Sequence, residues 1–271
     1  MILANRLRRR TQPKFNVWDL SQLTLVDSFS VASQATKVAG LGCSPDGLRF
    51  YVAGVESGDI FQYALSIPWV IGSASFVQTL PVSSYTTNPS GVVFKPDGTR
   101  MFISDNINKT IQQYNLSAAW DISTASFSTS IPAQDGTPGI SQLVTDLCFS
   151  ADGTNLYETG KVDGGIYCST LPTPWSLSGA YLLNFFDVSS QTTDPQDVVF
   201  NEDGTKMFIS AMDYAVQYDL STAWDITSAS FALADSAHVD AGSIRGFVFS
   251  ANGRFLYALD TIVDEIRQYR V

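Results

Sequence analysis

Short apolar runs and polar turns alternate along the chain, and the alternation repeats. Five openings share one pattern, in which an apolar run, a turn with glycine and a second apolar run follow one another: AGLGCSPDGLRFYVAG from Ala39, SGVVFKPDGTRMFISD from Ser90, TDLCFSADGTNLYETG from Thr145, QDVVFNEDGTKMFISA from Gln196 and RGFVFSANGRFLYALD from Arg245. Asp-Gly and Asn-Gly between apolar runs are strong hairpin signals. Each opening therefore predicts two antiparallel strands, A and B.

Two further segments follow each opening. The third, strand C, has the sequences GDIFQYALS, KTIQQYNLS, GGIYCSTLP, YAVQYDLS and DEIRQYRV. The fourth, strand D, contains one of the five tryptophans, Trp69, Trp120, Trp175, Trp224 or Trp18. The openings are spaced by 51, 55, 51 and 49 residues, and repeats of this length with four strands indicate the blades of a β-propeller.

The last repeat lacks its fourth segment, because the chain ends at Val271 after strand C. The missing segment, Phe15 to Ser30 with Trp18, stands at the N-terminus. Pairing it with the last blade closes the ring and removes an open sheet edge. We therefore predict an all-β, five-bladed β-propeller of four-stranded antiparallel blades over residues 15–271, preceded by a basic arm over residues 1–14.

The repeats carry a family resemblance. SPDGLRFYV and KPDGTRMFI resemble the segment that joins the first two strands in WD-repeat, NHL and surface-layer propellers. The longer pattern at Tyr114–Phe127 and Tyr218–Phe231 resembles repeats of propellers encoded by tailed phages and marine bacteria. The resemblance implies the fold, and it implies little about activity, because propellers serve as hydrolases, lactonases, lectins and scaffolds.

Charge divides the chain into two parts. The arm carries five basic residues and no acidic one, namely Arg6, Arg8, Arg9, Arg10 and Lys14, which leaves 11 basic residues against 26 acidic ones in the body. An acidic body argues against nucleic-acid binding by the propeller. No apolar run approaches the ~20 residues that cross a bilayer, so no membrane insertion is expected. The N-terminus lacks the features of a signal peptide, so we expect synthesis in the cytoplasm.

Few residues offer familiar catalytic or metal chemistry. His238 is the one histidine of the sequence, so a histidine-based nucleophile is hard to build. The three cysteines, Cys43, Cys148 and Cys168, are too scattered for a metal site and are expected as buried thiols. Hairpin aspartates such as Asp97 are explained by turn chemistry. We therefore expect no metal and no cofactor.

Three acidic residues break the repeat. Asp146 and Asp197 open their A strands where the other blades have glycine, and Glu158 stands at an apolar position of strand B. A buried carboxylate must be paired, neutralised or open to water. If the protein is an enzyme, Asp146, Glu158 and Asp197 are its expected acid–base set; a structural salt bridge between Glu158 and Lys161 is the alternative for the glutamate.

Propellers usually contact ligands through the B–C and D–A loops, which meet on one face. Here those loops are polar and differ among blades, which favours recognition. The residues expected on this ligand-binding face are Glu56, Asp59, Asp105, Asn106, Asn108, Asp163, Asp213, Tyr214 and Asp264.

These observations lead to one main functional prediction and two alternatives. The main prediction is a non-catalytic binding or structural propeller of a phage virion, either a capsid decoration or a tail receptor-binding protein. Its arm would dock on other virion subunits, and its loops would bind a surface glycan or receptor. The alternatives are a carbohydrate-active or lactonase-like hydrolase and an intracellular protein-interaction scaffold.

Overall fold

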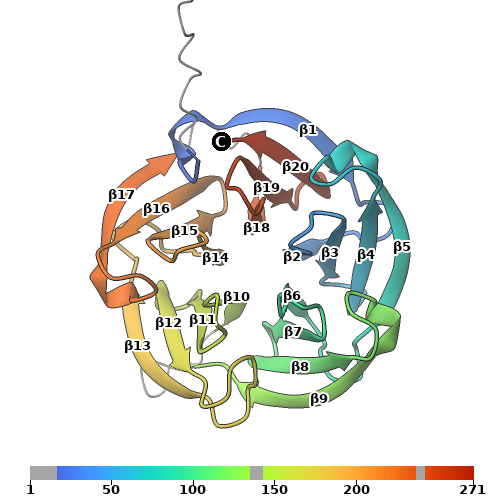
Figure 1. Ribbon diagram of the computed structural model, residues 1–271, viewed down its shortest axis with the longest axis horizontal. Helices are drawn as coiled ribbons and strands as arrows, with labels where there is room; N and C mark the ends of the chain where they lie inside the picture. Colours follow the sequence, from blue (N-terminus) through green and yellow to red (C-terminus); the bar gives the residue numbers. More distant parts are fainter. Residues whose placement is uncertain (1–16, 135–142, 236–241) are drawn as a thin grey trace, which may run out of the picture.

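The computed structural model describes residues 17–134, 143–235 and 242–271, which form five four-stranded antiparallel sheets arranged as blades of a ring (Figure 1). Blade one contains β2 (Val38–Cys43), β3 (Arg49–Gly54), β4 (Asp59–Leu65) and β5 (Ala74–Pro81), and blade two contains β6 (Pro89–Phe94), β7 (Arg100–Asp105), β8 (Thr110–Leu116) and β9 (Ala125–Pro132). Blade three contains β10 (Val144–Phe149), β11 (Asn155–Gly160), β12 (Gly165–Thr170) and β13 (Tyr181–Asp187), and blade four contains β14 (Asp197–Phe200), β15 (Lys206–Ala211), β16 (Tyr214–Leu220) and β17 (Ala229–Asp235). The predicted five-bladed propeller is confirmed.

Blade five is assembled from both ends of the chain. It combines β18 (Ile244–Phe249), β19 (Phe255–Asp260) and β20 (Glu265–Arg270) with β1 (Thr24–Ser30), which pairs antiparallel with β20. The closing strand is thus shorter than the predicted segment, because the 3-10 helix η1 (Leu20–Gln22) precedes it. Phe15 and the basic arm lie outside the described residues.

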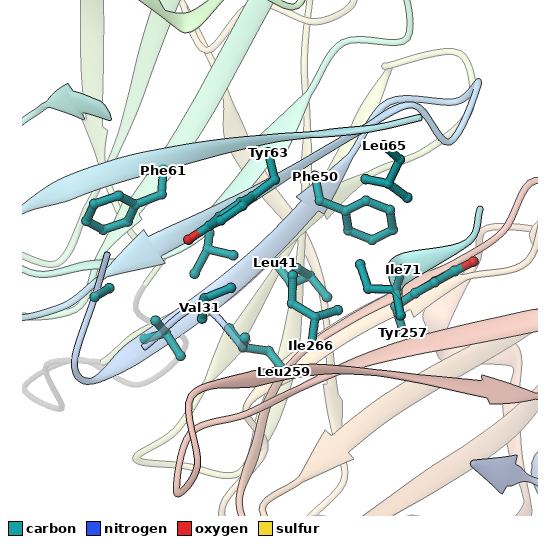
Figure 2. Close-up of a cluster of buried hydrophobic side chains, with 13 residues drawn as sticks. Val31, Leu41, Phe50, Phe61, Tyr63, Leu65, Ile71, Tyr257, Leu259 and Ile266 are labelled. Atoms are coloured by element: carbon teal, nitrogen blue, oxygen red, sulfur yellow. The ribbon is translucent and has the colours of Figure 1, made fainter. Parts of the chain in front are cut away.

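The hydrophobic core lies between neighbouring blades. Figure 2 shows one such cluster, in which residues of blade one pack against residues of blade five: Leu41, Phe50 and Tyr63 against Tyr257, Leu259 and Ile266. Burying apolar surface between blades stabilises the ring as a whole. The helices in the described part of the chain are three-residue 3-10 turns, and none of them is long or apolar enough to span a membrane.

Each tryptophan is fixed against the hairpin of its own blade. Its backbone N–H donates to the carbonyl of the hairpin glycine at 2.9–3.1 Å, as for Trp69 with Gly47 and Trp18 with Gly253. All five tryptophans have a left-handed backbone, with φ of 59° to 66°, which is uncommon outside glycine. A Cβ atom on Gly253 would lie 2.3 Å from the Trp18 ring. The glycine therefore allows both the tight turn and the close approach of the tryptophan ring, which explains why glycine and tryptophan recur together in the repeat.

Glutamines of the C strands connect neighbouring blades. The Oε1 atoms of Gln62, Gln113, Gln217 and Gln268 accept the backbone N–H groups of Ile122, Leu177, Leu20 and Ile71 in the next blade, at 3.0–3.4 Å. Blade three has Cys168 at this position of the repeat. Its link to blade four keeps the bond of the Tyr157 hydroxyl, which donates to the Trp224 carbonyl at 2.6 Å as Tyr51 and Tyr257 do to the equivalent carbonyls, but it lacks the glutamine.

This difference predicts unequal effects of two matched substitutions. The Trp120 carbonyl accepts from both the Tyr51 hydroxyl (2.7 Å) and Gln62 Nε2 (3.1 Å), whereas in the described chain the Trp224 carbonyl accepts from Tyr157 alone. Tyr157→Phe leaves a carbonyl without a donor and is expected to lower the free energy of unfolding by about 2 kcal/mol. Tyr51→Phe should cost about 1 kcal/mol or less. Urea denaturation measures both, and equal losses would contradict the assignment.

Candidate functional site

The five inner strands β2, β6, β10, β14 and β18 surround the central axis (Figure 1). At one position of the repeat, three of them have a glycine, namely Gly40, Gly91 and Gly246. A Cβ atom on Gly40 would lie 2.5 Å from the Gly91 Cα atom, so only glycine allows β2 and β6 to approach this closely. Blades three and four have Asp146 and Asp197 at the same position, and these side chains lie against the inner strands of the neighbouring blades.

Asp146 extends from blade three toward blade two. Its side chain is buried, and its Oδ1 atom accepts the backbone N–H of Leu147 at 2.7 Å. A Cβ atom on Gly91 would lie 2.1 Å from the same oxygen, which places the carboxyl group directly over that glycine. Among the described residues, the buried Oδ2 atom has no hydrogen-bond partner.

Asp197 is also buried, and it extends toward blade five. Its Oδ2 atom accepts the backbone N–H of Phe247 at 2.6 Å, and the backbone N–H of Val198 also favours the charged form. Burial nevertheless raises the pKa of Asp197 to about 7. Burial, followed by the nearby charge of Asp197, raises the pKa of Asp146 well above its usual range.

The two carboxyl groups therefore titrate as a pair. Two close carboxyls in a poorly solvated site do not ionise together, so one of them keeps a proton near neutral pH. Asp197 receives backbone N–H groups that stabilise its ionised form, whereas Asp146 has an oxygen atom without a donor in the described chain. The geometry assigns the proton to Asp146 and the negative charge to Asp197.

The pair borders a cavity of about 150 Å³ that all five inner strands line. Apart from the two aspartates, the lining consists of Leu41, Gly42, Cys43, Val92, Val93, Phe94, Leu147, Cys148, Val199, Phe247 and Val248. Asp146 and Asp197 are buried, whereas Cys148 and Val199, which lie two residues further along the same strands, are half-buried. The cavity therefore opens toward the A–B hairpins, on the face opposite the loops that the sequence favoured for ligand binding.

Sequence reasoning missed the two cysteines of this lining. Cys43 and Cys148 were expected as buried thiols, yet both are half-buried at the cavity. Burial raises the pKa of Cys43 to about 12, and it also raises the pKa of Cys148 strongly. Thiols with raised pKa values are poor nucleophiles at neutral pH. Their positions in the repeat could have shown that they line the cavity, because Cys43 follows Gly40 by three residues and Cys148 follows Asp146 by two.

Glu158 does not belong to this site. It lies in β11 opposite Leu147, is buried, and accepts the backbone N–H of Gln134 at 2.9 Å through Oε2. It is absent from the lining of the cavity, because strand B is the second strand from the axis. Lys161 forms its ion pair with Asp194, at 2.9 Å, rather than with Glu158. The predicted set of three carboxyls is thus a pair.

Several residues predicted for the ligand-binding face have structural roles instead. Asp105 is fully buried, and its carboxylate accepts the backbone N–H groups of Thr87, Ile107 and Asn108 at 2.7–2.9 Å. It holds the loop after β7 and is not available to a ligand. Asn108 also donates to Asp105 through its amide.

The remaining loop residues vary in exposure. Glu56 is exposed and paired with Lys37, and Asp163 accepts the Tyr167 hydroxyl. Tyr214 is half-buried, and its hydroxyl donates to the Gln191 carbonyl at 2.7 Å. The others are Asp59 and Asp264, which are half-buried, Asp213, which is exposed, and Asn106, which lines a small separate cavity. The arm residues lie outside the described part of the chain.

Comparisons with known proteins find similarity in structure only. No protein-family model matches the chain, and no curated protein matches it in sequence. A Bacteroides uniformis protein, whose name proposes a 6-phosphogluconolactonase, is 15% identical with a TM-score of 0.52, covering 86% of this chain and 65% of its own. The Pseudomonas aeruginosa periplasmic gluconolactonase is 19% identical with a TM-score of 0.52, covering 87% and 66%. A Lactobacillus plantarum protein is 13% identical with a TM-score of 0.51, covering 82% and 63%.

These matches correct the main functional prediction. At such identities the likeness establishes the fold, and this chain spans slightly less than two thirds of each similar protein. Two of the three are named as lactonases, and none of the three is named as a WD-repeat, NHL, surface-layer or phage protein. The prediction of a non-catalytic phage virion component is therefore wrong.

Proposed function

We propose that the chain is a hydrolase that opens a small uncharged lactone in the central cavity. The observation that carries this proposal is the buried pair of Asp146 and Asp197. The surroundings of the two side chains differ enough to leave one carboxyl protonated and the other ionised. Two titratable groups with separated proton affinities are the usual arrangement of a general acid and a general base. The names of two structurally similar proteins support the same reaction class.

The pair can complete the reaction without an added group. Asp197, as the base, takes a proton from water while the water oxygen bonds to the lactone carbonyl carbon. The tetrahedral intermediate then collapses, the bond from that carbon to the ring oxygen breaks, and Asp146 donates its proton to the departing oxygen. The product is a single hydroxy acid, with the new carboxylic acid and alcohol groups in the same molecule. A proton passing from Asp197 to Asp146 restores the starting state.

The cavity limits the substrate in size and charge. Its volume of about 150 Å³ is comparable to that of an engineered cavity that holds one benzene molecule, a six-membered ring. Among the described residues that line it there is no lysine, arginine or histidine, so a phosphate group would enter without a counter-charge. An unsubstituted six-membered lactone fits this site better than a phosphorylated sugar lactone.

Hydrolysis of two lactones tests the proposal. The purified chain is mixed with δ-valerolactone or with 6-phosphoglucono-δ-lactone, and acid release is followed with a pH indicator against the spontaneous rate. We expect acceleration with δ-valerolactone and a much smaller effect with the phosphorylated lactone. If neutral six-membered lactones are opened no faster than in buffer, the proposed function is wrong.

A further inference from the structure

A second cavity lies at the other end of the central axis. It is lined by one residue at the same repeat position of each blade, Ala39, Ser90, Thr145, Gln196 and Arg245, and by Asn106 from the loop after β7. Thr145 and Gln196 directly precede the two aspartates of the carboxyl pair. Asn106 belongs to the B–C loop of blade two, so the cavity lies at the loop end of the axis and is separate from the one that opens toward the hairpins.

Most polar groups of this cavity are already engaged. The Ser90 hydroxyl donates to the Val144 carbonyl at 3.0 Å, and the Thr145 hydroxyl donates to the Pro195 carbonyl at 3.2 Å. The Gln196 amide donates to Asp194 at 2.5 Å. None of these three side chains therefore has a hydrogen-bond donor left for a ligand.

Arg245 is different. Its side chain is half-buried, and within the described residues its buried Nε atom has no hydrogen-bond partner. No ion pair joins it to a described carboxylate: Asp260 of the same blade is paired with Arg267 at 3.1 Å, and Asp194 is paired with Lys161. A partly buried guanidinium without an anion is costly, and an anion that supplies the missing acceptor would relieve the cost.

The size of the cavity restricts the anion. Its volume of about 10 Å³ takes roughly one water-sized group, so a ligand inserts a single oxygen atom and keeps its remaining atoms outside. A monocarboxylate has one negative charge, which matches the single charge of the guanidinium while one of its oxygens enters the cavity. A phosphate group carries close to two negative charges near neutral pH, so one guanidinium leaves part of that charge uncompensated.

We propose that Arg245 binds a carboxylate group at this end of the ring, with Asn106 beside it. The ligand is a monocarboxylate, carried either by a free small acid or by the C-terminus of a peptide. This inference goes beyond the proposed hydrolase and does not depend on it, because binding is measured without any lactone.

The test compares salts at equal ionic strength. Sodium acetate at about ten times its dissociation constant is expected to raise the Tm by about 3 °C, while sodium chloride and sodium phosphate give smaller shifts. Arg245→Gln should abolish the acetate shift, and Arg254→Gln, which removes an exposed arginine of the blade-five hairpin, should leave it intact. Equal acetate shifts in wild type and Arg245→Gln would overturn the proposal.

A second measurement needs no variant. ¹³C-labelled acetate should show line broadening with the wild-type protein, and an excess of unlabelled acetate should reverse it. Trialanine with a free C-terminus and trialanine amide then distinguish the two sources of the carboxylate. If only the free acid displaces the labelled acetate, the site also accepts a peptide C-terminus. If neither peptide displaces it, the ligand is a small acid. Absence of acetate broadening with the folded wild type would overturn the site.

Discussion

Replacing Asp197 with asparagine is expected to lower the rate of lactone hydrolysis by about 10²–10⁴-fold, the usual contribution of a positioned acid or base. The amide oxygen can still accept the Phe247 N–H that Asp197 accepts at 2.6 Å, so the fold is retained while the proton acceptor is lost. Asp146→Asn should have a comparable effect, because it removes the donor to the departing oxygen. The measurement is kcat with δ-valerolactone.

The matched control is Asp213→Asn, which neutralises an exposed carboxylate in the B–C loop of blade four. Its rate should equal that of the wild type. The double variant Asp146→Asn/Asp197→Asn should lose little more than either single variant, because the two groups act as a unit. Full activity in Asp197→Asn with an intact fold would remove the pair from the mechanism.

Deletion of residues 1–30 is expected to abolish cooperative folding. The deletion removes β1 and exposes the edge of β20, and it also removes Leu20 and Leu23 from the core between blades four and five. Gln217 loses the Leu20 N–H that it accepts. The combined loss is on the order of a whole domain's stability of ~5–15 kcal/mol. Thermal unfolding and size-exclusion chromatography would report a non-cooperative or aggregated chain.

A permuted chain separates ring closure from simple loss of residues. The Val271 and Trp18 N–H groups bond to Arg254 and Gly253, so the two ends meet beside one hairpin. In blade one, three residues join Leu65 to Trp69. Placing residues 17–30 after Val271 through two residues, so that three residues again separate Val271 from Trp18, should therefore restore cooperative unfolding. If the permuted chain stays unfolded, the closing segment acts in some other way.

The fold was predictable because its determinants recur within short stretches of sequence. The hairpin glycine and the tryptophan, such as Gly253 and Trp18, contact each other in every blade, so each repeat displays the same pair of signals. Ring closure followed from counting, because Trp18 was the one tryptophan without a preceding opening. The exact start of β1 was not predicted, because the short helix η1, which is capped by Asp19 and contacts Gln217 of another blade, takes up the residues before it.

The site was only partly predictable. Asp146 and Asp197 were found because they replace glycine at a fixed position of the repeat. Glu158 was grouped with them because sequence spacing does not show that strand B lies one strand away from the axis. Asp105 was predicted to face ligand, although an aspartate at the end of a strand can equally accept loop N–H groups. Arg245 was overlooked, although it stands one residue before the same glycine/aspartate position.

The stability of the protein against pH tests the carboxyl pair most directly. The pKa of both groups is raised in the folded state, to about 7 for Asp197, from an ordinary value near 4. A raised carboxyl pKa gives stability that is fully present below about pH 4 and is lost as pH rises through the folded pKa. Asp152 and Asp203, whose pKa values are lowered by hydrogen bonds from Thr154 and Thr205, act oppositely and only at lower pH.

The decisive measurement is the free energy of unfolding in urea between pH 4 and pH 8, for the wild type and for Asp146→Asn/Asp197→Asn. Other groups cancel in the difference between the two proteins. We expect the wild type to lose stability relative to the variant by up to about 3 kcal/mol per pH unit below about pH 7, where both folded carboxyls keep protons that the unfolded chain has lost. Above about pH 7, where Asp197 is ionised, the expected loss is about 1 kcal/mol per pH unit. Parallel curves would show that the carboxyls titrate normally, and they would contradict a buried pair with raised pKa values.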